Sequence, residues 1–314
     1  MTESRRPQFD RMSAAARIGG FAVVLAVIFA AATLAGAKLD PSVDEPDPGH
    51  DSASEAMDGH ESSSGATAGD LPGLAVADAG YRLLPARTSV ASGPSAEYAF
   101  CIVGPDGETV RDFEVEHERR MHLIVVRRDF EGFQHLHPEQ LPDGTWTVDL
   151  DARLPGVHRV FADFAAAGRS LTLGTDLFVP GDFDPEPLPP VASTAGAGDG
   201  YEVAVDTTSH GEDAGRVHFT ITRNGRELRS VEPYLGADGH LVALREHDQA
   251  FLHTHPEGKP GGRGPISFQV EYPSAGRYRL FLQFKHAGEV RTAAFTREVT
   301  GSSAVTEEAS HGAH

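Results

Sequence analysis

Six histidines stand at matching positions in the two halves of this sequence, and imidazole is a common ligand of transition metals. They are His122, His135 and His137 in the first half, and His240, His253 and His255 in the second. In each half the first histidine precedes a His-x-His-Pro motif by 13 positions. Side chains two residues apart on an extended strand point to the same face, so each motif presents two imidazoles side by side. The pattern predicts two equivalent metal-binding clamps.

A third imidazole can complete each clamp from the strand before the motif. His122 and His240 begin the apolar runs HLIVVR and HLVALR, and the segments RRDFEGF and REHDQAF are short enough to be hairpin loops. Three neutral imidazoles suit Cu(II) or Zn(II), and copper is favoured because imidazole sites bind Cu(II) more strongly. Cu(I) is less expected because only Met121, of four methionines, neighbours the predicted site, next to His122. Further candidate ligands are Asp129, Asp163, His247 and Asp248.

The same histidines have two other interpretations. They could brace a hairpin by hydrogen-bonding backbone carbonyls, with Pro138 or Pro256 ending the strand because proline lacks an N–H group. The chain would then be a structural module that presents a surface to another envelope protein. Clustered imidazoles could also sense pH, since they would repel one another when protonated below about pH 6.5. Metal ligands must meet at a pocket that solvent reaches, whereas bracing imidazoles should be buried and paired with carbonyls.

Composition and motifs argue against several other functions. The formal net charge of -19 excludes a basic surface of the kind that binds nucleic acid. The sequence contains no GxSxG, no phosphate-binding glycine loop, no HExxH and no pair of a nucleophilic cysteine with histidine. We therefore expect a protein that is not an enzyme.

An internal repeat of about 100 residues positions the two histidine sets. Short runs rich in Val, Ile, Phe and Tyr alternate with turn signals such as Asn224-Gly225, and no amphipathic helix interrupts them. This pattern predicts an all-β protein with two tandem immunoglobulin-like β-sandwiches, and a small barrel is the alternative. We expect modules at residues 73–184 and 201–300, a Pro- and Gly-rich linker at 185–200, and a disordered tail at 301–314.

The N-terminal region predicts a membrane anchor. Residues 18–37 carry no charge and match the length of about 20 residues that crosses a bilayer. Arginines precede this segment and acidic residues follow it, so residues 1–17 are expected in the cytoplasm and the modules outside. Residues 38–72 are rich in Asp, Ser, Gly and Glu and read as a disordered tether. The alternative is a cleaved signal peptide, because Ala35-Gly36-Ala37 fits a cleavage site.

Several strings resemble a known group of proteins. They are MHLIVVRRDFEGFQHLHPE, PGVHRVFADF, EPYLGADGHLVALRE, FLHTHPEG and AGRYRLFLQFKHAGEVRTAAF. These are similar to uncharacterised secreted or membrane-anchored actinobacterial proteins, some loosely labelled heavy-metal-binding, and the resemblance covers both modules. It implies metal handling through the six histidines. The chain is also distantly similar to small copper-binding sandwich domains of the bacterial envelope, but it lacks their methionine-rich ligand sets.

Overall fold

The computed structural model describes residues 71–206 and 215–300, all without a helix. In this part of the chain, no helix is long and apolar enough to cross a membrane. The predicted cytoplasmic segment 1–17, the membrane helix 18–37 and the tail 301–314 lie outside the described residues, as does the tether 38–72 apart from its last two residues.

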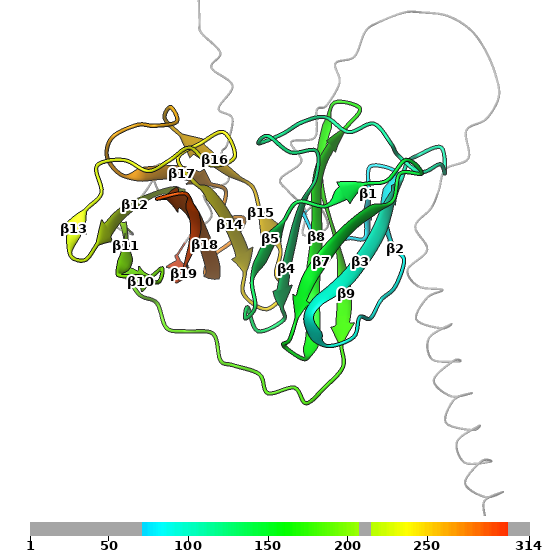
Figure 1. Cartoon of the computed structure of the whole chain (residues 1–314), viewed down its shortest axis with the longest axis horizontal. Coiled ribbons are helices and arrows are strands. Elements are labelled where there is room, and N and C mark those ends of the chain that lie inside the picture. The colour runs from blue at the N-terminus through cyan, green and yellow to red at the C-terminus, as the bar shows by residue number, and fades with distance from the viewer. Residues whose placement is uncertain (1–70, 207–214, 301–314) are drawn as a thin grey trace, which may run out of the picture. The chain divides into compact units, whose positions relative to one another are not determined.

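The first module consists of two antiparallel sheets, drawn from cyan to green in Figure 1. One sheet has the order β1-β2-β3-β7-β6 and the other has the order β5-β4-β8-β9. The strands are β1 (Ala77–Asp78), β2 (Tyr81–Pro85), β3 (Gly93–Val103), β4 (His122–Arg127), β5 (Gln134–Leu136), β6 (Glu139–Gln140), β7 (Trp146–Ala152), β8 (Gly156–Ala166) and β9 (Arg169–Val179).

The second module repeats this arrangement, with sheets β10-β11-β12-β17-β16 and β15-β14-β18-β19, and with β13 paired to β12. The strands are β10 (Thr194–Gly196), β11 (Tyr201–Asp206), β12 (Arg216–Arg223), β13 (Arg226–Glu227), β14 (His240–Arg245), β15 (Phe251–Leu252), β16 (Thr254–Glu257), β17 (Ile266–Val270), β18 (Gly276–His286) and β19 (Glu289–Val299). Strand β10 lies inside the predicted linker 185–200 and adds an edge strand to β11.

The order of the strands is that of an immunoglobulin-type sandwich. In the first module β2-β3-β7-β6 corresponds to strands A-B-E-D, and β4, β8 and β9 correspond to C, F and G. The second module has the same order in β11-β12-β17-β16 and β14-β18-β19. For residues 71–206 and 215–300, the prediction of an all-β fold with tandem β-sandwiches is confirmed.

Each module encloses its own apolar core between its two sheets. In the first module Tyr98, Phe100 and Trp146 of one sheet pack against the sheet that contains Leu123 and Val125. In the second module, buried and more exposed residues alternate along β11 and β17, as expected for strands with one face in a core.

Strand β4 departs from this alternation because all six of its residues are buried. Leu123 and Val125 face the core of the first module, whereas Ile124 and Val126 belong to a third apolar cluster. That cluster also contains Val242 and Leu244 of β14 in the second module. A strand buried on both faces reads as an unbroken apolar run, which is how HLIVVR and HLVALR appear in the sequence.

The same faces of the two modules pack against each other in this third cluster. Phe133 stacks on Phe281 with ring centroids 4.1 Å apart, and Phe251 lies 5.5 Å from Phe161. In the repeat, Phe133 corresponds to Phe251 and Phe161 corresponds to Phe281. The two aromatic contacts are therefore one contact made twice, which is the pattern of an isologous interface. Both modules belong to the same compact unit.

Candidate metal centre

Local strand pairing brings the histidines of the first module together. His122 begins β4, and the loop that follows returns the chain as β5, which pairs antiparallel with β4. Leu123 lies opposite Leu136, and Ile124 lies opposite His135. One step further along this register, His122 faces His137, so the hairpin supplies all three imidazoles.

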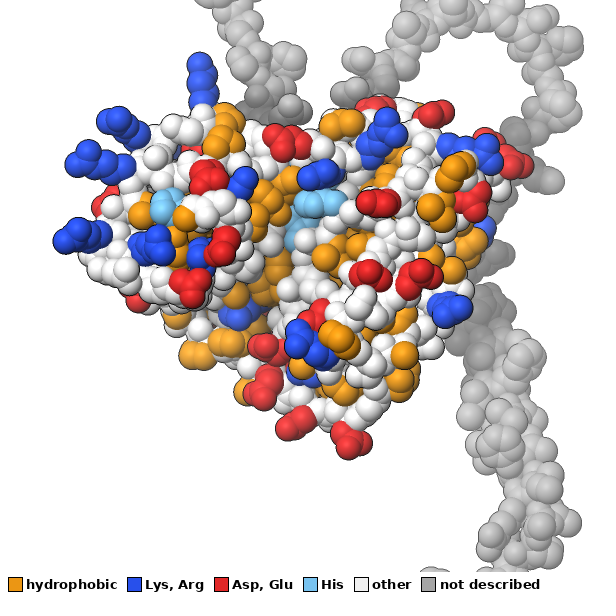
Figure 2. All heavy atoms as spheres, viewed as in Figure 1, with side chains coloured by type: hydrophobic (Ala, Val, Ile, Leu, Met, Phe, Trp, Pro, Cys, Tyr) orange, Lys and Arg blue, Asp and Glu red, His pale blue; other side chains and the backbone are white. Residues whose placement is uncertain are grey.

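The three rings are close enough to share one ion. One ligand atom from each of His122, His135 and His137 lies within 4.8 Å of the others. The ring centroid of His122 is 5.2 Å from that of His135 and 5.1 Å from that of His137, and the last two are 4.9 Å apart. His122 is buried, while His135 and His137 are partly exposed. Figure 2 shows histidine side chains, in pale blue, reaching the surface at two separate places on the face in view.

Hydrogen-bond partners fix the tautomers of His122 and His135. Nδ1 of His135 lies 2.7 Å from Oε1 of Gln283, and Nε2 of His122 lies 3.1 Å from the backbone oxygen of Glu116. Both oxygens only accept hydrogen bonds, so each of these ring nitrogens must carry the proton of its neutral imidazole. The remaining nitrogens, Nδ1 of His122 and Nε2 of His135, then turn lone pairs toward each other across 3.0 Å.

His137 adds a third imidazole nitrogen to this centre. Its Nε2 atom is buried and has no hydrogen-bond partner among the described residues. A buried polar atom without a partner costs about 1–3 kcal/mol, which a bound cation would remove. Two facing lone pairs and one unpartnered nitrogen are thus available at this centre.

None of the three imidazoles is protonated to its charged form at neutral pH. Protein surrounds the rings closely, and this burial lowers the pKa of His135 to about 3 and that of His137 to about 4. After burial, the charge that His122 would carry is the second contribution to both of these decreases. Burial also lowers the pKa of His122, against the carbonyl of Glu116 and the carboxylate of Asp163, which raise it. All three imidazoles are neutral at pH 7, which is the form that binds metal.

The geometry fits two neighbouring positions around a metal ion. With metal–nitrogen bonds of about 2.0–2.1 Å, two ligands lie about 2.9 Å apart at a right angle and about 3.4 Å apart at the tetrahedral angle. The 3.0 Å between Nδ1 of His122 and Nε2 of His135 falls between these values. Metal-bound imidazoles usually donate their other N–H to a carbonyl or carboxylate, and Glu116 and Gln283 supply such acceptors.

His240 of the second module packs on this centre instead of building one of its own. Its ring is stacked on that of His122 at 5.7 Å and lies 4.6 Å from the ring of His135. Burial, followed by the charge that His135 would carry, lowers its pKa well below the usual range.

His253 and His255 are placed differently from their counterparts in the first module. After β15 the chain leaves β14, and β16 pairs with β17 of the opposite sheet, so that His255 lies across from Gln269. His255 is exposed and His253 is partly buried. Both line a groove of about 350 Å³ together with His117, Asp163 and His240. Among the described residues, the first-module histidines are the one group of three whose ligand atoms lie within 4.8 Å.

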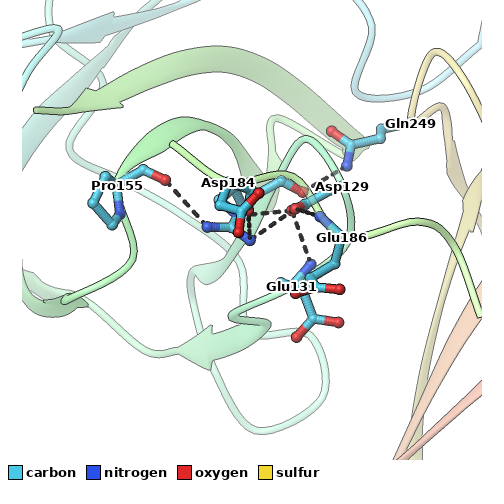
Figure 3. A network of polar contacts seen from close by, with 7 residues as sticks. Asp129, Glu131, Pro155, Asp184, Glu186 and Gln249 are labelled. Carbon is cyan, nitrogen blue, oxygen red and sulfur yellow. Dashed lines mark hydrogen bonds and ion pairs between the residues drawn. The ribbon is translucent and has the colours of Figure 1, made fainter. Parts of the chain in front are cut away.

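The other candidate ligands have different partners. Asp129 accepts two hydrogen bonds from Arg127, and Asp248 binds Arg245 in the same way. Asp129 also accepts a hydrogen bond of 2.9 Å from the backbone N–H of Glu186, and Figure 3 shows these two residues in one network of polar contacts. Both aspartates are therefore structural.

Two candidate ligands remain to be placed. Asp163 is paired with His122 in the sheet and accepts a hydrogen bond from Thr172. His247 has a mostly exposed side chain near Glu246.

Two residues near the centre were not singled out by the sequence. His117 lies at the tip of a tight turn, with its ring 6.1 Å from His122 and 5.9 Å from His240. It has a φ of 47°, in the left-handed region that histidine enters more readily than most residues. Gln283 comes from the second module. Its position in the repeat, across from His240 as Asp163 is across from His122, was the available signal.

Comparison with solved structures gives distant matches to several bacterial proteins. The chain is 15% identical to Yersinia pseudotuberculosis InvD over 70% of this chain and 57% of that one, with a TM-score of 0.23. It is 14% identical to the Escherichia coli adhesin FdeC over 70% and 66%, with a TM-score of 0.23. A putative membrane anchored protein from Corynebacterium diphtheriae is 10% identical over 72% and 59%, with a TM-score of 0.22. The chain spans less than two-thirds of each, and similarity this low carries no functional conclusion.

Comparison with protein families gives a clearer result. No curated protein matches the sequence. One family matches twice, at residues 76–180 and 194–301, and these segments contain both histidine sets. Together they make up more than half of the chain. The chain therefore belongs to the family described as a domain of unknown function, DUF8832.

Proposed function

We propose that this protein is a metal-binding protein that holds Cu(II) or Zn(II) with His122, His135 and His137. The observation that carries the proposal is the 3.0 Å distance between Nδ1 of His122 and Nε2 of His135, on two rings whose other nitrogens each lie next to an oxygen that accepts a hydrogen bond. Nδ1 of His122, Nε2 of His135 and the unpartnered nitrogen of His137 are the ligand atoms. Copper is the first choice because imidazole sites prefer Cu(II) over Zn(II).

The setting of the proposed function is the outside of the membrane. Residues 18–37 anchor the chain by a single helix, with residues 1–17 in the cytoplasm and both modules exported. The site sequesters the metal or passes it to another envelope protein, and no chemical conversion is involved. The groove lined by His117, His253 and His255 borders the centre and offers a route for the ion.

One observation favours a second candidate, a structural or interaction module whose histidines brace the hairpin. His122 is 3% exposed, and its Nε2 atom lies 3.1 Å from the backbone oxygen of Glu116. Bracing accounts for this contact. It does not account for the facing lone pairs or for the buried nitrogen of His137.

Calorimetric titration with Cu(II) and Zn(II) tests the proposal, and the repeat supplies a matched control. The full chain is compared with a variant carrying His135→Ala and His137→Ala and with a control carrying His253→Ala and His255→Ala. The two variants lose the same motif, but only the first loses two of the proposed ligands. Both keep the other histidines of the chain.

The expected result is one tight site that disappears in the first variant and persists in the control. Equal loss in both variants would contradict the placement of the ion in the first module, and would favour one equivalent site per copy. Binding that is unchanged in the first variant would overturn metal binding by these histidines and leave the bracing role.

A further inference from the structure

A residue of the second module orients a ligand of the first. Gln283 lies on β18, and its Oε1 atom accepts a hydrogen bond of 2.7 Å from Nδ1 of His135. Its Nε2 atom donates to Thr292 at 3.4 Å, which directs the oxygen toward His135. Gln283 is 7% exposed, so solvent does not replace this contact easily.

The contact determines which nitrogen of His135 can bind a metal. With the proton held on Nδ1, the lone pair is on Nε2, the atom that faces His122. Without an acceptor at Nδ1, the proton can move to Nε2 and close the site. Gln283 therefore does for His135 what the backbone oxygen of Glu116 does for His122.

The repeat shows that this position differs between the copies. In the sheets, Gln283 is paired with His240, as Asp163 is paired with His122. Each of these two side chains also forms a hydrogen bond with a threonine on the next strand, Asp163 with Thr172 and Gln283 with Thr292. An amide in the second copy offers His135 an acceptor without adding a negative charge to the buried interface.

Other contacts join the modules beside the centre. His240 covers the rings of His122 and His135, and Phe133 stacks on Phe281. At the far end of β4, the side-chain amide of Gln249 donates to the backbone oxygen of Arg127 at 3.0 Å. Figure 3 shows Gln249 reaching toward the network that also holds Asp184 and Glu186, at the start of the connection between the modules.

We propose that Gln283 is a positioning residue for the metal centre and that the centre is complete only when the two modules are docked. The inference rests on the proposed metal binding and deepens it. Metal binding then stabilises the docked arrangement, and docking strengthens metal binding by the same factor, because the two equilibria are linked.

The first test measures Zn(II) affinity by calorimetry in the full chain carrying Gln283→Met. Methionine keeps the length of the side chain, but its sulfur is a weak acceptor of the hydrogen bond from Nδ1 of His135. Loss of an outer hydrogen bond to a metal ligand typically weakens affinity by about 10- to 100-fold. Gln283→Glu restores an acceptor and is expected to rescue the affinity. Gln269→Met, the same exchange on the other sheet of this module, is the control and should bind as the original chain does.

The second test detects docking rather than affinity. Backbone hydrogen exchange is measured along β14 and β18 of the second module, with and without Zn(II). These strands carry no proposed ligand, so slower exchange there on adding Zn(II) reports the linkage. Gln283→Met is expected to reduce that protection, and Gln269→Met to leave it unchanged.

The outcomes separate the two proposals. If Gln283→Met binds Zn(II) as tightly as the original chain, or if Zn(II) does not protect β14 and β18, the inter-module inference is overturned. Metal binding itself still stands in that case, provided that the variant with His135→Ala and His137→Ala loses its site. If that variant also binds normally, the proposed function fails together with the inference.

Discussion

Lowering the pH from 8 to 5 should destabilise the metal-free protein through its buried imidazoles. His135 has an ordinary pKa of 6.5 when exposed, and burial lowers the pKa to about 3 in the folded protein. Between these values the unfolded chain binds a proton that the folded chain excludes. The contribution of His135 to the free energy of unfolding is therefore fully present above pH 6.5, and it is lost as the pH decreases toward 3.

The size of the effect follows from the two pKa values. A pH of 5 lies about 1.5 units below the pKa of His135 in the unfolded chain, so that imidazole is almost fully protonated. In the folded protein the imidazole of His135 remains neutral at this pH. At about 1.4 kcal/mol per unit, His135 alone removes about 2 kcal/mol from the free energy of unfolding. The other histidines of the centre act in the same direction.

Urea unfolding at pH 8 and pH 5 measures this loss. Trp146 is the single tryptophan of the sequence and is 3% exposed in the core of the first module, so its fluorescence reports unfolding of that module. His135→Gln removes the titrating group and keeps a polar side chain, and its stability should fall by about 2 kcal/mol less than that of the original chain. Equal losses in the two proteins would refute the reasoning that burial of His135 disfavours its charged form.

Three further predictions concern the interface, the ion pairs and the metal. Phe281→Ala removes the ring stacked on Phe133 and should lower the free energy of unfolding by about 3 kcal/mol in urea titrations. Asp129→Ala leaves Arg127, whose side chain is 5% exposed, without its carboxylate and should cost about 3 kcal/mol. Asp248→Ala breaks the corresponding ion pair of the second module, between Arg245 and Asp248, which is more exposed. This change should lower the free energy of unfolding by about 1 kcal/mol or less in the same assay. Zn(II) affinity measured by calorimetry should change little between pH 7 and pH 5.5, because burial lowers the pKa of all three ligand histidines, to about 3 for His135 and about 4 for His137, so that protons compete little with the metal there.

The sandwich fold follows from local signals in the sequence. Alternating apolar and polar residues predict the alternating burial observed on strands such as β11. The pair Asn224-Gly225 predicts a hairpin turn, and both residues have left-handed backbone conformations in the structure. The burial of both faces of β4 is different. The run HLIVVR lacks alternation, but what covers Ile124 and Val126 is the second module, which no local pattern identifies.

The histidine centre shows the same division. The same-face arrangement of His135 and His137 follows from strand periodicity, and the arrival of His122 follows from a short hairpin loop. The different placement of His255 depends on β16 pairing with the opposite sheet, although the motif is the same in both copies. The role of Gln283 depends on how the modules pack, so spacing along the chain does not reveal it.

The most direct test of the central claim is to count the imidazole nitrogens bound to the metal. The full chain loaded with one equivalent of Cu(II) is measured by pulsed electron paramagnetic resonance, alongside the variant His137→Ala. The account predicts three imidazole ligands in the original chain and two in the variant. A single imidazole ligand in the original chain, or the same count in both proteins, would contradict a centre formed by His122, His135 and His137.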